Sequence, residues 1–315
     1  MPRSDRWRRE PVALLGGVAI YLSVAATGSV AMAIGNAGAG LLAAGSLIFL
    51  LGLRDDLRPL GPPAKLAAEA MVALALVALG VRLEATGSTP VDSIVTVLWV
   101  VGMINAVNLL DNMDGLAAGV VVIAAGFRMS LFLLQGDTAG AGAAAIVAGA
   151  AAGFLLHNRH PASVFMGDSG SLFLGFCLAG LELGAGGGRT HRSISLGVAA
   201  GLIVLLPIFE TVWIVATRWH ERRPLTRGGR DHVSHRLVAF GLSEPLAVAA
   251  LHGAAIVSGA LALVTYRFGA ARTAPLIALW LVALAVVGVW LARLPPPPDE
   301  PAPPGSARDR ISEGA

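Results

Sequence analysis

Long apolar runs recur along this sequence, and each is close to the length that crosses a lipid bilayer as a helix. Such a helix needs about 20 consecutive, mainly apolar residues. Only 14% of the residues are charged, whereas a typical soluble domain has about 25%. The sequence therefore predicts an all-α, polytopic integral membrane protein with about ten transmembrane helices. The predicted spans are residues 11–33, 38–53, 66–81, 91–110, 115–134, 138–156, 169–186, 194–217, 245–265 and 273–292.

Both ends of the sequence differ in composition from the region between them. The first residues, MPRSDRWRRE, are basic and precede an apolar run too long for a signal peptide. Residues 294–315 are rich in proline and charge, which is typical of disordered segments. The sequence thus predicts a basic cytoplasmic N-terminus at 1–10, one transmembrane domain at 11–293 and a disordered cytoplasmic tail at 294–315.

The loops between the predicted spans carry unequal numbers of basic residues. Of the 23 lysines and arginines, 17 fall on the side of the N-terminus, 5 fall on the other side, and Arg128 lies inside a span. Basic residues in short loops favour the cytoplasmic side. The sequence therefore predicts a multi-pass protein of the cell inner (plasma) membrane with cytoplasmic N- and C-termini. A basic balance of this origin indicates a membrane as the partner, and no nucleic acid.

Four polar segments interrupt the apolar sequence, and all of them fall in loops on the predicted cytoplasmic side. They read RDDLRPLGPPAK, NLLDNMDG, HNRHPASVFMGDSG and RRPLTRGGRDHVSHRL. Polar groups that gather at one membrane face from four separate loops indicate one assembled site.

The segment NAVNLLDNMDGL places Asn108, Asp111 and Asp114 at intervals of three residues. If a helix continues through this segment, the three side chains share one of its faces. Oxygen ligands on one face suit a hard cation such as Mg²⁺, which takes one or two carboxylates together with substrate phosphates. The alternative is a helix end in which these residues cap the next helix at Gly115, but capping accounts for only one of the two acids.

Asp55 and Asp56 are adjacent acids, which repel each other unless a cation or a shared proton relieves them. A solvated helix end flanked by arginines is an equally good interpretation. Lys65 is the only lysine in the chain, and a lysine at the membrane surface binds phosphate as a point charge. An ordinary helical pair with Glu69, four residues later, is the alternative.

The segment FMGDSGSLFLGF begins a predicted span with Asp168 and Ser169. Asp168 is interpreted either as the cap of this helix, which its position alone favours, or as a further metal ligand. The small residues around it would let a phosphate approach the backbone amides at the N-terminus of the helix.

The most basic loop contains His232, His235 and Arg236. Two histidines at this spacing on a helix can bind zinc, but no third ligand is near in the sequence. A basic loop suits a pyrophosphate at least as well. Glu210 lies inside a predicted span, where an acid is costly and therefore indicates function.

Five motifs follow one another in this chain between about Pro11 and Leu242. They are PVALLGGVAI, GLRDDLRPLGPPAK, NAVNLLDNMDGL, FMGDSGSLFLGF, and LPIFETV followed by DHVSHRL. In this order they resemble the motifs of the polyprenyl-phosphate N-acetylhexosamine-1-phosphate transferases (glycosyltransferase family 4), multi-span enzymes that begin cell-envelope glycan synthesis. Each motif is modest by itself, but five in the family's order make a strong signal.

The resemblance implies that residues 11–293 form a single transmembrane catalytic domain. Its expected reaction transfers N-acetylhexosamine-1-phosphate, with N-acetylglucosamine as the expected sugar, from a UDP-sugar to polyprenyl (undecaprenyl) phosphate and releases UMP. The implied cofactor is Mg²⁺, with Mn²⁺ as an alternative ion. The implied partners are the polyprenyl phosphate lipid, the UDP-N-acetylhexosamine and the membrane, and a homodimer is left open.

The resemblance also implies roles for individual residues. It predicts that Lys65 binds the lipid phosphate and that Asp55 or Asp56 orients or deprotonates it. The predicted catalytic residues are Asp55, Asp56, Asp114 and Asp168. The predicted metal ligands are Asn108, Asp111 and Asp168. The predicted substrate-binding residues are Lys65, Asn105, Ser169, His232, His235 and Arg236.

The sequence departs from the family pattern in three places. Asn112 stands where the pattern often has glycine. The peptidoglycan branch, the phospho-N-acetylmuramoyl-pentapeptide transferases, typically has a tighter histidine run than His232 and His235, which favours the N-acetylglucosamine branch and keeps the former as the alternative function. Members usually have one more span before the Gly–Gly motif, so either the start of this chain is truncated or this member lacks that helix.

Two other classes of membrane protein match fewer features. A CDP-alcohol phosphatidyltransferase needs an arginine where this sequence has Gly119, and its later acids are missing, since the next acid is Asp137. A transporter would carry charged residues near the middle of the membrane, often beside broken helices. Here the acids cluster at one predicted face, with Glu210 as the exception.

Overall fold

The computed structural model describes residues 16–31, 36–183, 194–224, 229 and 231–293. Every regular element within these residues is an α-helix. The helices are α1 (Gly16–Ala31), α2 (Asn36–Leu57), α3 (Pro62–Ala78), α4 (Thr89–Leu110), α5 (Leu116–Leu134), α6 (Thr138–Asn158), α7 (Gly167–Leu183), α8 (Ile194–Ile203), α9 (Leu205–His220), α10 (Val233–Ala239), α11 (Glu244–Phe268) and α12 (Ala270–Ala292). The predicted N-terminal segment 1–10 and the predicted tail 294–315 lie outside the described residues.

Each predicted span corresponds to one helix or to one pair of helices. Six helices in the described part are long and apolar enough to cross a membrane, namely α2, α4, α5, α6, α11 and α12. The bent pair of α8 and α9 makes a seventh if it is one span. The all-α, multi-pass prediction is therefore confirmed. The number of ten spans is not, because α1, α3 and α7 are shorter helices of 16 or 17 residues.

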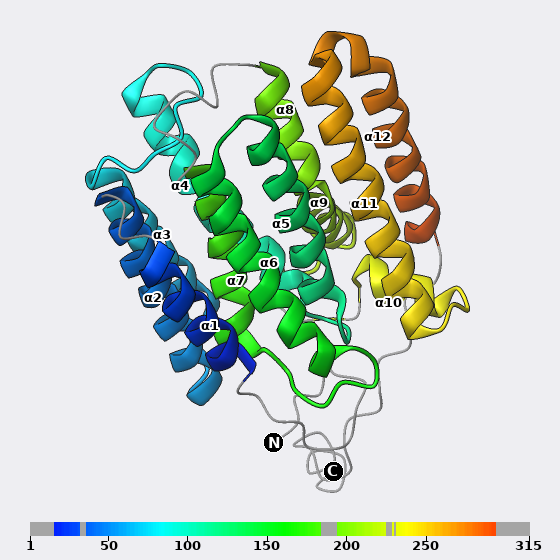
Figure 1. Cartoon of the computed structure of the whole chain (residues 1–315). Helices are drawn as coiled ribbons and strands as arrows, with labels where there is room; N and C mark the ends of the chain where they lie inside the picture. Colours follow the sequence, from blue (N-terminus) through cyan, green and yellow to red (C-terminus); the bar gives the residue numbers. More distant parts are fainter. Residues whose placement is uncertain (1–15, 32–35, 184–193, 225–228, 230, 294–315) are drawn as a thin grey trace, which may run out of the picture.

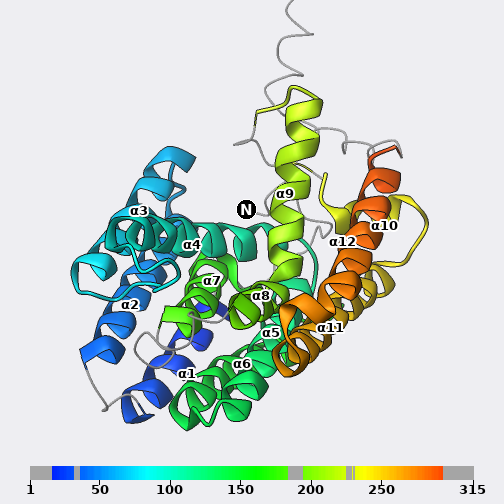
Figure 2. The same cartoon turned by 90° about the horizontal axis from the view of Figure 1, so that it is seen from above.

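The span predicted at 194–217 is broken into α8 and α9, which differ in direction by 69°. Pro207 lies in the first turn of α9, where its missing N–H group is not needed for the helix. Figure 1 shows α9 end-on and Figure 2 shows it lengthwise, so it runs across the direction of α5 and α11. The residues after α9 contact the turn that follows α4.

Helix α7 occupies the interior of the bundle, where it packs against α1, α2, α4, α5 and α6. Most of its residues are buried. Gly175 allows a very close approach to α4, since an added Cβ there would lie 2.7 Å from the backbone of Ile104 and Met103. The first residue of α7, Gly167, is thereby held at a constant position relative to the ends of α2 and α4.

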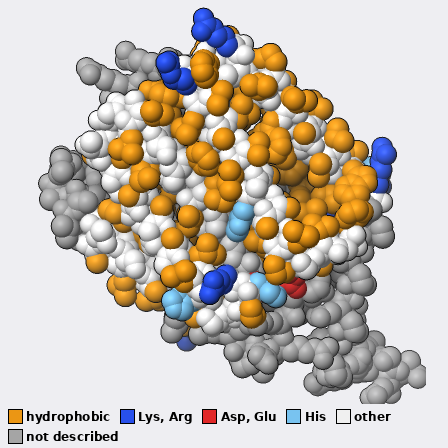
Figure 3. All heavy atoms as spheres, turned by 45° about the vertical axis from the view of Figure 1, so that its right-hand side comes forward, with side chains coloured by type: hydrophobic (Ala, Val, Ile, Leu, Met, Phe, Trp, Pro, Cys, Tyr) orange, Lys and Arg blue, Asp and Glu red, His pale blue; other side chains and the backbone are white. Residues whose placement is uncertain are grey.

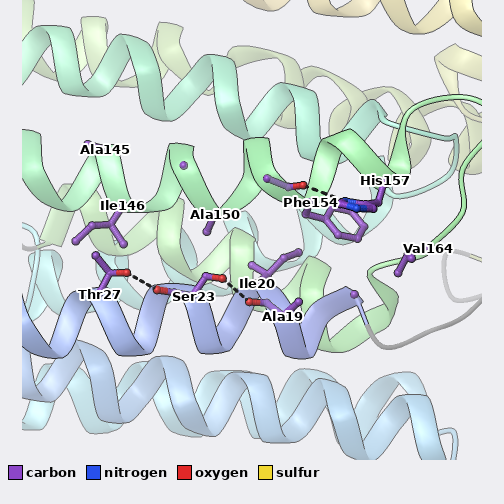
Figure 4. Close-up of a pocket in the computed structure, with 13 residues that line it drawn as sticks. Ala19, Ile20, Ser23, Thr27, Ala145, Ile146, Ala150, Phe154, His157 and Val164 are labelled. Atoms are coloured by element: carbon purple, nitrogen blue, oxygen red, sulfur yellow. Dashed lines mark hydrogen bonds between the residues drawn. The ribbon is translucent and has the colours of Figure 1, made fainter.

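The outer surface of the bundle is mainly apolar. Figure 3 shows a face covered by hydrophobic side chains, with the few basic side chains away from its centre. On another face, α1 and α6 line a groove of about 800 Å³ (Figure 4). The hydroxyl groups of Ser23 and Thr27 in this groove donate to carbonyls of their own helix, so its lining is apolar along α1. His157 is the one ionisable side chain among the described residues that line it.

The polar loops lie together at one end of the bundle, the lower end in Figure 1, where α1 begins and α12 ends. Hydrogen bonds and ion pairs connect the end of α2, the start of α3 and the end of α4 with the start of α7. Others connect the loop after α4 with the residues that follow α9. The expectation that four separate polar segments form one assembly is confirmed by these contacts.

Candidate active site

Asp168, in the first turn of α7, stands at the centre of the assembled polar residues. Its Oδ2 accepts a hydrogen bond from Lys65 Nζ at 2.7 Å, and its Oδ1 accepts one from Asn108 Nδ2 at 3.2 Å. The same Asn108 group donates to the buried hydroxyl of Ser171 at 2.8 Å. Three segments that are far apart in sequence therefore meet at one carboxylate. Lys65 hydrogen-bonds to this acid, whereas Glu69 accepts its hydrogen bond from Asn105.

Asp56 holds the N-terminus of α7. Its two carboxylate oxygens accept hydrogen bonds from the backbone N–H groups of Asp168 at 2.8 Å and Ser169 at 3.0 Å. Asp56 therefore caps α7 from another helix. Gly167 adopts a φ of 66° and lies so close to Asp56 that an added Cβ would be 2.6 Å from a carboxylate oxygen.

This cap corrects two expectations from the sequence. Asp168 does not cap its own helix with its side chain, because the side chain turns to Lys65 and Asn108 instead. The amides that were expected to meet a phosphate are bonded to Asp56. Ser169 is buried, and its hydroxyl donates to the carbonyl of Met166 at 3.3 Å. The structure thus gives Asp56 and Ser169 positions that support the start of α7.

Asp55 points from the last turn of α2 toward the same cluster. Its Oδ2 lies 3.6 Å from Lys65 Nζ, and its Oδ1 accepts a hydrogen bond from the backbone of Leu60 at 2.6 Å. The side chain is buried, with 5% of its surface exposed. The ammonium group of Lys65 accordingly lies between two carboxylates, those of Asp55 and Asp168. The two adjacent acids have different surroundings: Asp56 binds backbone amides, and Asp55 faces the cation.

The helix α4 ends at Leu110, earlier than a shared helical face requires. Asp111 has a ψ of 50°, outside the helical region, and Gly115 adopts a left-handed φ of 77°. The prediction that Asn108, Asp111 and Asp114 share one face of a continuous helix is therefore wrong. A turn of this kind reverses the chain within a few residues, so the side chains after Leu110 leave the helical spacing.

Asp114 supports the loop between α6 and α7. Its Oδ2 accepts a hydrogen bond from the backbone N–H of Ala162 at 2.9 Å and lies 3.3 Å from His160 Nδ1. His160 is also 3.6 Å from Glu244 at the start of α11. Asp114 thus connects three segments of the polar end, and its seen contacts are with these segments and not with Asp168.

Asn105 lies one helical turn before Asn108 on α4. Its Nδ2 donates to the carboxylate of Glu69 and to the carbonyl of Val101. Glu69 is fully buried in α3. The structure therefore places Asn105 in an interhelical contact between α3 and α4, beside the cluster around Asp168.

The histidine loop, defined here as residues 231–236 (DHVSHR), is anchored to α9. Arg218 binds Asp231 through two hydrogen bonds of 2.7 and 2.9 Å, and both side chains are buried. Glu210 Oε1 lies 3.0 Å from His232 Nδ1 and accepts a hydrogen bond from the backbone N–H of Val233 at 3.2 Å. Glu210, an acid inside a predicted span, thus orients His232 and the start of α10.

The other two predicted residues of this loop are buried. His235 has 2% of its surface exposed, and its ring meets that of His232 edge to face with 5.4 Å between the centroids. Arg236 is 1% exposed, with its Nη2 at 3.5 Å from Glu221 Oε1. His232 and His235 therefore form one ring pair, while Arg236 contacts the end of α9.

The pair of Arg218 and Asp231 makes a testable prediction about pH. Burial by itself raises the pKa of the Asp231 carboxyl, but the hydrogen bonds and the charge of Arg218 outweigh burial, so the pKa lies below its ordinary 3.8. A lowered pKa means that the pair stabilises the fold above about pH 4 and loses this effect as the pH falls through the lowered value. We expect Asp231→Asn to destabilise the protein by about 3 kcal/mol near neutral pH.

The measurement is the apparent melting temperature of the purified wild type and of Asp231→Asn as a function of pH. Their difference should be constant from about pH 9 to about pH 5 and should shrink below about pH 4. A difference that is absent at neutral pH, or that does not shrink in acid, would contradict this assignment.

The cluster around Asp168 has the donors that a hard divalent cation requires. Asp55 and Asp168 carry carboxylates, and Asn108, whose amide nitrogen donates to Asp168, carries an amide oxygen. The ammonium group of Lys65 contacts both carboxylates, so these two acids already surround a positive charge. Mg²⁺ typically takes one or two carboxylates and completes its shell with phosphate oxygens and water. In the described part of the chain, no three side chains of His, Cys, Asp or Glu are grouped as a metal site.

Sequence reasoning assigned no role to Asp231 and Asn158, and it treated Ser171 only as one of the small residues at the start of its span. Ser171 binds Asn108, and Asp231 fixes the histidine loop. Asn158 joins the two loops beside the site, since it accepts from Gly115 N at 2.9 Å and donates to Val164 O at 2.9 Å. Asp231 stands directly before His232 in DHVSHRL. An acid next to basic residues was the sequence signal that could have indicated its role. No local pattern pointed to the partners of Ser171 or Asn158.

Gly52 determines how closely α2 approaches the start of α7. An added Cβ at this position would lie 2.4 Å from the carbonyl oxygen of Asp168 and 2.6 Å from the Cα of Ser169. Both neighbours are backbone atoms, which cannot turn aside as a flexible side chain can. The position of Asp168 relative to Asp55 and Asp56 therefore depends on a glycine in α2.

Comparisons with known proteins agree with this arrangement. Residues 39–185 match the model of glycosyl transferase family 4. A probable undecaprenyl-phosphate N-acetylglucosaminyl 1-phosphate transferase of Bacillus subtilis is 33% identical over 252 residues, which are 76% of this chain and 69% of that protein. The decaprenyl-phosphate N-acetylglucosaminephosphotransferase of Mycolicibacterium smegmatis is 29% identical over 78% of this chain and 70% of its own length.

Similarity to the peptidoglycan branch covers less of the chain. The phospho-N-acetylmuramoyl-pentapeptide-transferase of Desulforamulus reducens is 41% identical, but only over 128 residues, which are 41% of this chain and 37% of that protein. The likeness to the two N-acetylglucosamine proteins extends over 76% and 78% of the chain, which agrees with the branch that the histidine spacing favours.

Proposed function

The chain belongs to glycosyl transferase family 4, and on this premise we propose that it transfers N-acetylglucosamine-1-phosphate from UDP-N-acetylglucosamine to a polyprenyl phosphate in the membrane, with release of UMP. Two relatives that are similar over more than three quarters of the chain are named for this transfer to undecaprenyl or decaprenyl phosphate. The product, a lipid-linked sugar diphosphate, is the starting unit of a cell-envelope glycan.

One observation carries the proposal: Lys65 and Asn108 both contact Asp168, and Asp55 contacts Lys65, at the polar end of an otherwise apolar bundle. Phosphoryl transfer requires positioning and the neutralisation of charge more than covalent chemistry. The ammonium group of Lys65 supplies a charge for the lipid phosphate. The two histidines of the histidine loop supply groups for the diphosphate of the nucleotide sugar. The location at the end of the membrane-spanning helices suits a reaction between a lipid and a soluble nucleotide.

The reaction exchanges one phosphorus–oxygen bond for another. An oxygen of the lipid phosphate attacks the β-phosphorus of the UDP-sugar, and the bond from this phosphorus to the oxygen of the α-phosphate breaks. UMP leaves with the bonding electron pair. Because the lipid phosphate is already largely ionised near pH 7, as are other phosphomonoesters with a second pKa near about 6, orientation of this oxygen matters more than removal of a proton.

The residues divide between the two substrates. Lys65 binds the lipid phosphate, and Asp55 orients it through their contact at 3.6 Å. His232, His235 and Arg236 belong to the side of the nucleotide sugar, where His232 and His235 face the diphosphate and Arg236 holds the loop to Glu221. Asp56 and Asp114 act by positioning, because their carboxylates bind backbone amides.

Mg²⁺, with Mn²⁺ as the alternative ion, is the proposed cofactor. Asp168 and Asn108, whose side chains are in contact, would hold it, and Asp111 stays a ligand predicted from the sequence alone. When bound, such an ion neutralises the charge that develops on phosphate oxygens. The side chains of this cluster supply hard oxygen donors for the ion. The ammonium group of Lys65 lies near two of these donors, the carboxylates of Asp55 and Asp168.

We further propose that the polar end faces the cytoplasm of a cell whose inner membrane holds the protein. Two observations support this orientation: the sequence assigns 17 of the 23 basic residues to the predicted loops of that side, and α1 begins and α12 ends there (Figure 1). Nucleotide sugars are charged and soluble, so a site on this side meets its donor without moving it across the membrane.

Release of UMP tests the proposed function. Purified protein with Mg²⁺, undecaprenyl phosphate and UDP-N-acetylglucosamine should form UMP and a lipid-linked product, and neither should form when the lipid phosphate is omitted. A panel of UDP-N-acetylhexosamines and UDP-N-acetylmuramoyl-pentapeptide separates the two branches. If no member of the panel yields UMP, the transferase proposal is wrong; if only the pentapeptide does, the alternative branch is correct.

A further inference from the structure

Asn112 connects the turn after α4 to the histidine loop. This turn follows Asn108 and Asp111, two of the proposed metal ligands. The Oδ1 of Asn112 accepts a hydrogen bond from the hydroxyl of Ser234 at 2.6 Å, and its Nδ2 lies 3.1 Å from His232 Nδ1. The same Nδ2 donates to the carbonyl of Leu109 at 2.8 Å, at the end of α4. One carboxamide thus contacts both sides of the site.

The hydrogen-bond partners determine which way the carboxamide faces. The carbonyl of Leu109 only accepts, so the nitrogen of Asn112 must face it. The oxygen then faces Ser234, whose hydroxyl donates to it. Ser234 is fully buried, and a buried hydroxyl without a partner is costly. The link between Asn112 and Ser234 therefore has a definite direction and a clear energetic reason to persist.

His232 is oriented from its other side by Glu210. A carboxylate only accepts, so the 3.0 Å contact with Glu210 requires a proton on His232 Nδ1. That proton prevents the amide of Asn112 from donating to the same nitrogen. The Asn112 amide therefore only packs against His232. The hydrogen bond that joins Asn112 to the histidine loop is the one with Ser234. With Nδ1 directed to Glu210, the Nε2 of His232 is left for a ligand.

We propose that Asn112 is a positioning residue that holds the histidine loop in register with the acidic side of the site, so that both engage the diphosphate of the nucleotide sugar together. The inference rests on the proposed function for its consequence in catalysis. The anchors at Arg218 and Glu210 tie the loop to α9, whereas Asn112 ties it to the turn beside Asn108. Loss of this link leaves the loop folded on α9 but free to shift against the other half of the site.

The backbone at Asn112 gives no reason of its own for this residue. Among the described non-glycine residues only Arg222 has a positive φ, so the turn does not demand glycine or asparagine at position 112. An alanine fits the same backbone and removes the carboxamide. This makes Asn112→Ala a clean test of the side chain.

We expect Asn112→Ala to raise the KM for UDP-N-acetylglucosamine about five- to tenfold, the effect of losing a hydrogen bond worth about 1 kcal/mol. The kcat and the KM for undecaprenyl phosphate should stay within about twofold, since the contacts of Lys65 and Asp168 are intact. Ser234→Ala should behave in the same way, and the double variant should be no worse than either single one.

Ser163→Ala is the matched control, because its hydroxyl donates to His157 O at the same end of the bundle without reaching the histidine loop. This control should leave every constant unchanged. An Asn112→Ala enzyme with an unchanged KM, or with an equal fall in kcat and kcat/KM, would overturn the inference. Effects of Asn112→Ala and Ser234→Ala that multiply in the double variant would overturn it as well.

A measurement without turnover separates this inference from the proposed function. Hydrogen exchange of the peptide covering Val233–Ala239 should be faster in Asn112→Ala than in wild type and in Ser163→Ala, by about fivefold for a loss of about 1 kcal/mol. Unchanged exchange overturns the link even if the enzyme releases UMP. Faster exchange in a protein that never releases UMP would support the link and refute the transferase function.

Discussion

Replacing Asp168 by asparagine should abolish sugar-1-phosphate transfer, with a fall in kcat of about a thousandfold or more. The amide has the size of the carboxylate but no charge, so it neither binds Lys65 as an ion pair nor offers a charged oxygen to a cation. Two contacts that assemble this cluster, those of Lys65 and Asn108, converge on Asp168. The fold should remain, since the backbone N–H of residue 168 still bonds to Asp56.

The measurement is UMP release at saturating substrates, together with the elution profile and melting temperature of the variant. Asp137→Asn serves as the control, because Asp137 accepts a hydrogen bond from Gly140 N as the cap of α6, away from the polar cluster. Asparagine caps helices about as well as aspartate, so the control should keep its activity. Full activity in Asp168→Asn would remove this residue from the proposed chemistry.

Gly52→Ala is expected to cause the second large loss. The new Cβ would lie 2.4 Å from the carbonyl oxygen of Asp168, so α2 and α7 must separate. Overpacking of this kind costs about 1–3 kcal/mol. It would also shift Asp168 relative to Asp55, and a displacement of about 1 Å in a catalytic group costs about a hundredfold in rate. We therefore expect a lower melting temperature and about 1% of the activity.

A second glycine in a helix provides the comparison. A Cβ added at Gly102 in α4 would meet no atom within 4 Å, and alanine has the higher helix propensity. Gly102→Ala should therefore keep both activity and stability. If Gly52→Ala behaves like Gly102→Ala, then the close approach of α2 to Asp168 is not what positions this acid.

The assembly of the site agrees with the expectation that polar loops at one membrane face act together. The sequence marked Asp55, Asp168 and Lys65 individually, and the structure brings all three into contact. The roles of the two neighbouring acids could not be separated in advance. Asp56 caps a helix whose first residues are 112 and 113 positions later in the chain, and no local spacing indicates such a partner.

The prediction for the segment after Asn108 failed for a local reason. Spacing by three suggests one helical face only if the helix continues, but α4 ends at Leu110 and Gly115 turns the chain with a left-handed φ. The alternative interpretation, in which this segment is a helix end, described the backbone correctly. Asn112, which stood outside every sequence assignment, turned out to contact the histidine loop.

The sequence by itself determined that the chain is a helical membrane protein, that its polar chemistry lies at one end, and which family its motifs resemble. Apolar length decides the first point, because a backbone in lipid must satisfy its hydrogen bonds internally and helices do so. Only the tertiary structure decided which side chains meet: Lys65 with Asp168, Asp56 with the amides of α7, and Asn112 with Ser234. These pairs depend on how closely the helices pack, which glycines such as Gly52 permit and which no single segment encodes.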